Sequence, residues 1–194
     1  PLTFNEGGSA TAITGTITVS DIDNPTLASA TVQITSGLDP EDVLEYTPAD
    51  GINGSAYNPS NGTITLTGSA TVAQYQAALR RMKYQNTNTI NPSTTTRTVS
   101  FTVNDGTSPS NTVTRNINVI AANSTPVIAN VDPAVLQYCA GSGEAVIAPA
   151  LTVTDIDNST MVSATVRISA GYAAAEDFLR FTVPTGITGV YNSG

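Results

Sequence analysis

The sequence contains no histidine and no tryptophan, and Cys139 is its only cysteine. A proton relay of the Ser-His-Asp or Cys-His type needs an imidazole, so the chain cannot form one by itself. Zinc sites built from cysteine and histidine are excluded for the same reason. One cysteine cannot form an internal disulfide, and we expect Cys139 to be a small, semi-buried and unreactive side chain. These absences argue against catalysis, and we expect that the chain is not an enzyme.

Basic residues are also scarce. The chain has seven of them against fifteen acidic residues, which gives a net charge of −8 and a pI near 4.1. Nucleic-acid binding needs clustered lysine and arginine, so we expect no nucleic-acid partner. No apolar run approaches the ~20 residues that span a bilayer, so we expect no membrane insertion. An acidic, threonine-rich surface without lysine clusters suits a protein that is secreted or displayed on the cell surface and that can hold hard cations through carboxylates.

The most informative feature that is present is an internal duplication. Residues 17–34 read ITVSDIDNPTLASATVQI, and residues 151–168 read LTVTDIDNSTMVSATVRI. Farther along, Glu41-Asp42 of the first copy aligns with Glu176-Asp177 of the second. We therefore divide the chain into a complete repeat one, residues 1–128, and an incomplete repeat two, residues 129–194. No signal peptide is visible and the chain opens at Pro1, so we expect a fragment of a longer polypeptide. Because repeat two stops about halfway, we expect that polypeptide to continue past Gly194.

Within repeat one the dominant hydrophobic period is two. Ile17 and Val19 alternate with polar residues, as do Ala30, Val32 and Ile34, and later Val99, Phe101 and Val103. Alternation of this kind, broken by Asn-Gly, Asp-Gly and Asn-Pro turns, predicts strands with one buried face and an all-β fold. We expect Glu41 and Asp42 to lie in a loop before a strand at residues 43–47.

One stretch departs from this period. Thr71 and Gln74 form a capping-box pattern, and Val72, Tyr75 and Leu79 follow at helical spacing. The sequence therefore predicts one short helix at residues 72–81, with Tyr75 and Leu79 facing the core.

An ordered set of motifs carries a family resemblance. Glu6-Gly7 comes first, then the turn of residues 21–24 (Asp-Ile-Asp-Asn), then GTITLTGSATVAQYQAAL at residues 62–79, and finally residues 101–106, which end in Asn-Asp-Gly. In this order the chain resembles the cadherin-like and chondroitin-sulfate-proteoglycan-type tandem repeats of large bacterial surface proteins. The resemblance implies immunoglobulin-like (cadherin-like) β-sandwich repeats in tandem, one short helix per complete repeat, and calcium at the junctions.

The resemblance also implies which residues hold that calcium. Glu6, Asn123, Asp155 and Asp157 match ligand positions that converge between the two repeats. Asp21, Asp23 and Asp105 match ligand positions at the other, N-terminal end of repeat one. A plainer alternative stays open for both Asp-x-Asp pairs, because aspartate and asparagine are common in turns, where they bond their own backbone.

Three other features have plain structural interpretations. The Glu41-Asp42 pair could be the acid and the nucleophile of a glycosidase. A catalytic pair is rarely duplicated in every repeat, and this one recurs in repeat two, so a structural role is favoured. The basic cluster of Arg80, Arg81 and Lys83 complements the end of the predicted helix. Four tyrosines are better explained as core or strand-edge residues than as a sugar-binding platform; they are Tyr46, Tyr57, Tyr75 and Tyr84.

The sequence thus predicts a calcium-associated structural and adhesive module of an extracellular bacterial surface protein. Its expected partners are neighbouring repeats of the same chain, with homophilic or carbohydrate contacts as further possibilities. The alternative is an accessory carbohydrate-binding or spacer domain of a secreted polysaccharide-degrading enzyme.

Overall fold

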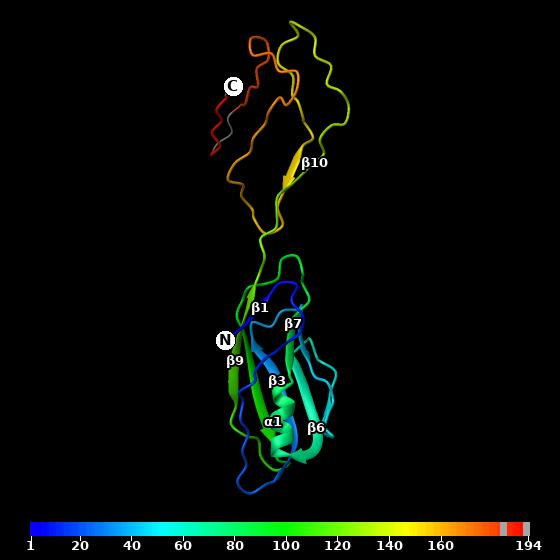
Figure 1. Ribbon diagram of the computed structural model, residues 1–194, viewed down its shortest axis with the longest axis vertical. Coiled ribbons are helices and arrows are strands. Elements are labelled where there is room, and N and C mark those ends of the chain that lie inside the picture. Colours follow the sequence, from blue (N-terminus) through cyan, green and yellow to red (C-terminus); the bar gives the residue numbers. More distant parts are fainter. Residues whose placement is uncertain (183–185, 192–194) are drawn as a thin grey trace. The chain divides into compact units, whose positions relative to one another are not determined.

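The computed structural model of the chain describes residues 1–182 and 186–191 (Figure 1). It divides into two units, Pro1–Asp157 and Asn158–Gly194. Strands dominate the first unit, which contains a single helix, so the predicted all-β class is confirmed.

Two sheets form the main body of the first unit. The larger has six strands in the order β1-β9-β8-β3-β6-β5, and the smaller has three in the order β2-β7-β4. The strands of the larger sheet are β1 (Leu2–Asn5), β3 (Thr26–Ser36), β5 (Asn53–Gly54), β6 (Thr63–Thr71), β8 (Arg97–Asn104) and β9 (Val113–Ile120). Those of the smaller sheet are β2 (Thr11–Ala12), β4 (Asp42–Glu45) and β7 (Lys83–Asn86).

Strand β3 is the centre of the larger sheet. It pairs antiparallel with β6 on one side and with β8 on the other, so that Val32 lies between Ile64 and Phe101. Because side chains alternate along a strand, Ala30, Val32 and Ile34 are buried, while Thr31 and Gln33 between them are only partly buried. The strands predicted from the alternation around Val99 and Val32 are confirmed.

The two sheets share one hydrophobic core, because the buried residues of both belong to a single cluster. Phe4 on β1 meets Tyr84 on β7 edge to face, with ring centroids 5.3 Å apart. Burial of this kind contributes about 25 cal/mol per Å² of apolar surface, and it is the main stabilising term for such a body.

Helix α1 (Val72–Arg80) follows β6 directly and confirms the predicted helix. The Thr71 hydroxyl accepts from the Gln74 backbone N–H at 3.3 Å, and the Gln74 carboxamide accepts from the Thr71 N–H at 2.8 Å. This reciprocal pair is the capping box that the sequence predicts. Tyr75 and Leu79 are fully buried, as expected, and α1 packs against β3 and β6.

The prediction of a strand around Ile17 and Val19 is wrong. Both side chains pack against the core, but residues 14–20 form no strand. Side chains of α1 take the backbone groups that a strand partner would use. The Val19 N–H donates to the Gln76 carboxamide oxygen at 3.1 Å, and the Ile17 carbonyl accepts from Arg80 Nε at 3.0 Å. This segment is therefore held by the helix instead of by a sheet.

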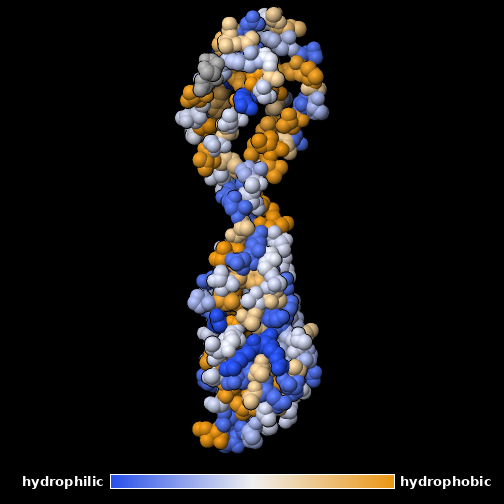
Figure 2. Space-filling view, viewed as in Figure 1, coloured by the Kyte–Doolittle hydropathy of each residue, from blue (hydrophilic) through white to orange (hydrophobic). Residues whose placement is uncertain are grey.

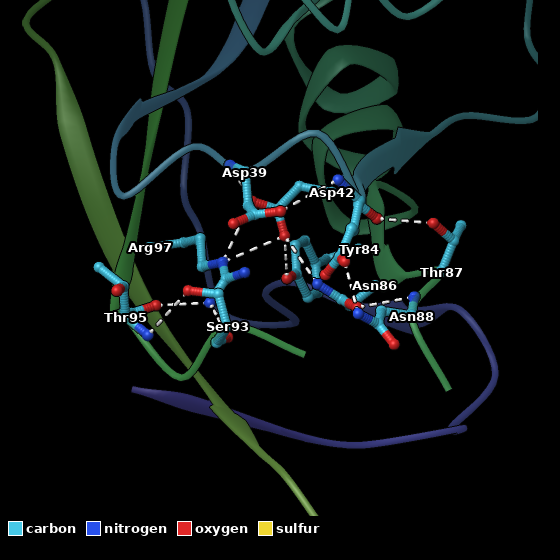
Figure 3. A network of polar contacts seen from close by, with 10 residues as sticks. Asp39, Asp42, Tyr84, Asn86, Thr87, Asn88, Ser93, Thr95 and Arg97 are labelled. Carbon is cyan, nitrogen blue, oxygen red and sulfur yellow. Dashed lines mark hydrogen bonds and ion pairs between the residues drawn. The ribbon is translucent and has the colours of Figure 1, made fainter. Parts of the chain in front are cut away.

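The expected position of Asp42 in a loop is also wrong. Asp42 is the first residue of β4 and is buried, and the strand ends at Glu45 instead of residue 47. Its carboxylate forms an ion pair with Arg97, whose Nε lies 3.1 Å from both carboxylate oxygens (Figure 3). The Tyr84 hydroxyl and the Asn86 amide also donate to it. A buried carboxylate needs this set of donors, since an unpaired buried charge is strongly destabilising.

The later part of the chain contains little regular structure. Strands β10 (Val127–Ala129) and β11 (Thr152–Thr154) form an antiparallel pair, and no helix or strand occurs among the described residues from Asn158 onward. Many apolar side chains of this part, among them Val162 and Val166, are exposed (Figure 2). Residues 160–170 match β3 in sequence but form no strand.

Within the described residues, no helix has the length and the apolar character that crossing a membrane requires.

The capping box gives a direct test of the fold. Replacing Thr71 by alanine should lower the free energy of unfolding by ~1 kcal/mol, because the Gln74 N–H loses its acceptor. Thermal unfolding should show this as a fall in Tm of ~4 °C. The matched control is Thr18→Ala, an exposed threonine outside the helix and strands, which should change stability by less than ~0.5 kcal/mol. Equal effects of the two changes would contradict the role of the cap.

Candidate functional site

The duplicated Asp-Ile-Asp-Asn turn has the same local hydrogen bond in both copies. The Asp21 carboxylate accepts from the Asp23 N–H at 3.2 Å and from the Asn24 N–H at 2.9 Å. In the second copy, the Asp155 carboxylate accepts from the Asp157 N–H at 3.2 Å. This is the self-capping turn that aspartate favours. The first aspartate of each pair thus makes the backbone contact that the turn interpretation predicts, and in the second copy Asp157 also bonds outside the turn.

At the N-terminal end of repeat one, the structure brings the turn next to the Asp105 loop. The Asn24 amide donates to Asp105 Oδ2 at 2.8 Å. Asp105 Oδ1 accepts from the backbone N–H groups of Thr107 and Ser108, at 2.7 and 2.8 Å. Asn24 thus links Asp21 and Asp105, since its backbone N–H donates to the first carboxylate and its side-chain amide to the second. Asn24, which bridges them, was not among the predicted site residues, although its position directly after Asp-Ile-Asp was visible in the sequence.

Hydrogen bonds control the acidity of this cluster. The pKa of Asp21 is lowered from 3.8, chiefly by the backbone N–H of Asn24 and then by Asp23, while the nearby negative charge of Asp105 acts in the opposite direction. The pKa of Asp105 is lowered from 3.8 by the backbone N–H groups of Ser108 and Thr107. Hydrogen bonds to the charged form favour ionisation. Both carboxylates are therefore negative at neutral pH and repel each other.

Glu6 contacts the start of the linker, residues 122–128, that leads out of repeat one. Its carboxylate oxygen Oε2 accepts from the Ala122 N–H at 2.8 Å, and its own N–H donates to the Ile120 carbonyl at 2.9 Å. The predicted position of Glu6 beside the linker is consistent with this contact. The carboxylate acts there as an acceptor for a backbone amide.

Asn123 lies in the linker, and Asp155 and Asp157 lie in the second aspartate turn, which follows β11. The Ser124 N–H donates to Asp157 Oδ2 at 2.6 Å, and the Asn123 amide donates to the Ser124 carbonyl at 2.7 Å. Residues of the linker and of the turn line one shallow hollow. They are Asn123, Ser124, Thr125, Val127, Thr154, Asp155 and Ile156. Asn123 and Asp155 thus line one hollow, and Asp157 accepts a hydrogen bond from Ser124, another lining residue. Glu6 is not among the lining residues.

A metal ion needs several donor side chains close together. Among the residues that the structure describes, no three Asp, Glu, Cys or His side chains form a group that could hold a metal ion. Calcium takes about six to eight oxygens, and a carboxylate pair supplies only part of this number. The aspartate turns therefore match calcium in the type of donor but not in the number of carboxylates.

The remaining features agree with their structural interpretations, with one exception. Tyr75 and Tyr84 are buried, and Tyr46 and Tyr57 are half-buried at the edge of the core. Arg81, in the basic cluster, pairs with Asp50 at 2.9 Å. The exception is Cys139, which is exposed and not semi-buried. It lies in a segment where residues 130–140 form no strand, so no core exists there to cover it.

Comparisons of the chain with protein-family models, with curated proteins and with solved structures found no match.

The aspartate cluster predicts a specific response to acid. Because the folded pKa values of Asp21 and Asp105 lie below 3.8, their contribution to stability is present above pH 3.8. It is lost as the pH falls through the lower, folded values. Carboxyl ¹³C NMR should show both groups titrating below 3.8. In Asn24→Ala the Asp105 midpoint should move upward, since one donor is removed, and Asn116→Ala should leave it unchanged. A midpoint at or above 3.8 for either group in the unaltered chain would contradict the account.

Proposed function

We propose that the chain is a structural and adhesive module of an extracellular bacterial surface protein, and that it is not an enzyme. In this proposal each complete repeat is an immunoglobulin-like, cadherin-like β-sandwich with one short helix. The repeats follow one another in tandem, and their junctions restrict the motion of neighbouring repeats.

The fold of repeat one supports this proposal. Its two sheets share one core, and the motifs that carry the resemblance occur in the order that the family has. The aspartate turn and the Asp105 loop meet at one end of the body through Asn24, as the resemblance implies.

The observation that carries the proposal is the second aspartate turn. Its Asp157 carboxylate accepts from the Ser124 N–H of the linker at 2.6 Å, while Asp155 closes the turn. A charge-assisted hydrogen bond to a backbone amide is stronger than a neutral one. The duplicated turn therefore fixes the path of the linker, which is what a spacer protein requires between its repeats.

Calcium is the proposed ion for the two aspartate turns. Asp155 and Asp157, together with Asn123 and Glu6, would hold it at the linker. Asp21, Asp23 and Asp105 would hold it at the other end. The ion would neutralise carboxylates that otherwise repel one another, and backbone carbonyls and water would complete its shell. Because the carboxylates are few, we expect weak binding.

Thermal unfolding with calcium and with excess chelator tests this function. A ligand that binds only the folded state stabilises by RT ln(1 + [L]/Kd), or about 2.7 kcal/mol at a hundredfold excess over Kd. Tm should then rise by several degrees. Asp155→Ala and Asp157→Ala should reduce the rise and the heat of calcium binding measured by titration calorimetry. The matched control is Asp132→Ala, an exposed aspartate of the same segment, which should keep both.

The opposite result has a definite meaning. If calcium changes neither Tm nor the calorimetric signal, the aspartates serve only as turn residues. A flexible spacer, or an accessory carbohydrate-binding domain of a secreted enzyme, would then be the better account.

A further inference from the structure

The loop of residues 87–96, between β7 and β8, is unusually well anchored. It contains neither helix nor strand and consists largely of threonine, asparagine and serine. Loops of this composition are ordinarily mobile. In this protein, side chains from the body hold the loop at both of its ends (Figure 3).

Glu41 holds the first end. Its backbone carbonyl accepts from the Thr87 N–H at 2.9 Å and from the Thr87 hydroxyl at 3.1 Å. Its carboxylate accepts from the Asn88 amide. The Asn88 side-chain oxygen in turn accepts from the N–H groups of Ile90 and Asn91, at 2.9 and 3.0 Å. Asn88 therefore transmits the anchor at Glu41 to the tip of the loop.

Arg97 holds the second end. Its Nη1 donates to the carbonyls of Ser93 and Thr95, at 2.5 and 2.6 Å, while its Nε pairs with Asp42. The Arg97 side chain is 0% exposed. A buried guanidinium needs acceptors for its donors, so the loop and the ion pair stabilise each other.

The tip of this loop contacts the second aspartate turn. The Asn91 side chain is exposed, and its amide donates to the Ile156 carbonyl at 3.1 Å. Ile156 is the residue between Asp155 and Asp157. The turn is thus held at two points, by Asn91 through a backbone carbonyl and by Ser124 through the Asp157 carboxylate.

We propose that the loop of residues 87–96 is a preformed docking surface for the Asp155–Asp157 turn, and that it restrains the junction without a metal ion. This inference rests on the proposed spacer function and adds a second restraint to it. Because Asn88 and Arg97 fix the loop in advance, docking the turn costs little additional conformational entropy. Both groups of the contact are uncharged, so it does not depend on neutralising the aspartates.

The test uses the full chain in excess chelator. Exchange of the Ser124 and Asp157 amide hydrogens is measured by NMR in the unaltered chain, Asn91→Ala, Asn88→Ala and Asn116→Ala. Asn91→Ala removes the contact and should speed the exchange of both amides by about threefold to tenfold, the effect of one hydrogen bond. Asn88→Ala should act in the same direction, because it loosens the tip. Asn116 is an exposed asparagine on β9 and serves as the control that should change nothing.

Each other outcome is informative. If Asn91→Ala exchanges like Asn116→Ala, the docking contact is overturned. If Asn91→Ala speeds exchange and Asn88→Ala does not, the claim that the loop is preformed is overturned. Repeating the measurement with calcium separates the two proposals. A loop effect without any calcium response would support the docking surface while contradicting the calcium proposal, and a calcium response without a loop effect would do the reverse.

Discussion

The buried ion pair between Asp42 and Arg97 is the constraint on which much of the first unit depends. Asp42 lies on β4 of the smaller sheet and Arg97 on β8 of the larger one, so the pair joins the two sheets across their shared core. Both side chains are 0% exposed, and the surrounding donors and acceptors come from β7 and the loop of residues 87–96. Breaking such a pair by removing one partner costs ~3–5 kcal/mol. The pair therefore links the two sheets, and its arginine also holds the loop that meets the second aspartate turn.

Local signals in the sequence predicted the local structure. The capping box at Thr71 and the alternation around Val32 and Val99 gave α1, β3 and β8, because each depends on residues near one another in the chain. The segment around Ile17 was misjudged because its backbone partners are side chains of α1, some sixty positions away. Asp42 was misjudged for a similar reason. Nothing near it in the sequence shows that Arg97 will neutralise it in the core, and a charged residue in a turn-rich stretch is otherwise a sign of a loop.

In the candidate site, too, local features were visible in the sequence and tertiary contacts were not. Repetition of Asp-Ile-Asp-Asn made both turns visible, and the structure gives them the same internal hydrogen bond. The sequence did not show that Glu6 and Asp157 accept from backbone amides of the linker, nor that Asn24 and Asn91 make the connecting contacts, because these pairings depend on the tertiary fold. Carboxylates that resemble ion ligands in the sequence thus also serve as acceptors that order the linker. In our proposal, hydrogen bonds hold the linker and the second aspartate turn in place, and bound calcium stabilises this arrangement further.

The most direct test of this account is a double-mutant cycle on the buried pair, with Asp42→Leu, Arg97→Met and the combined variant. Urea unfolding should show that each single change costs ~3–5 kcal/mol and that the combined change costs much less than the sum, because no unpaired charge remains in the core. In the combined variant the amides of residues 87–96 should nevertheless exchange faster, since the loop has lost the Arg97 donors. Additive costs together with unchanged exchange of the loop would contradict the claim that this pair joins the sheets and holds the loop.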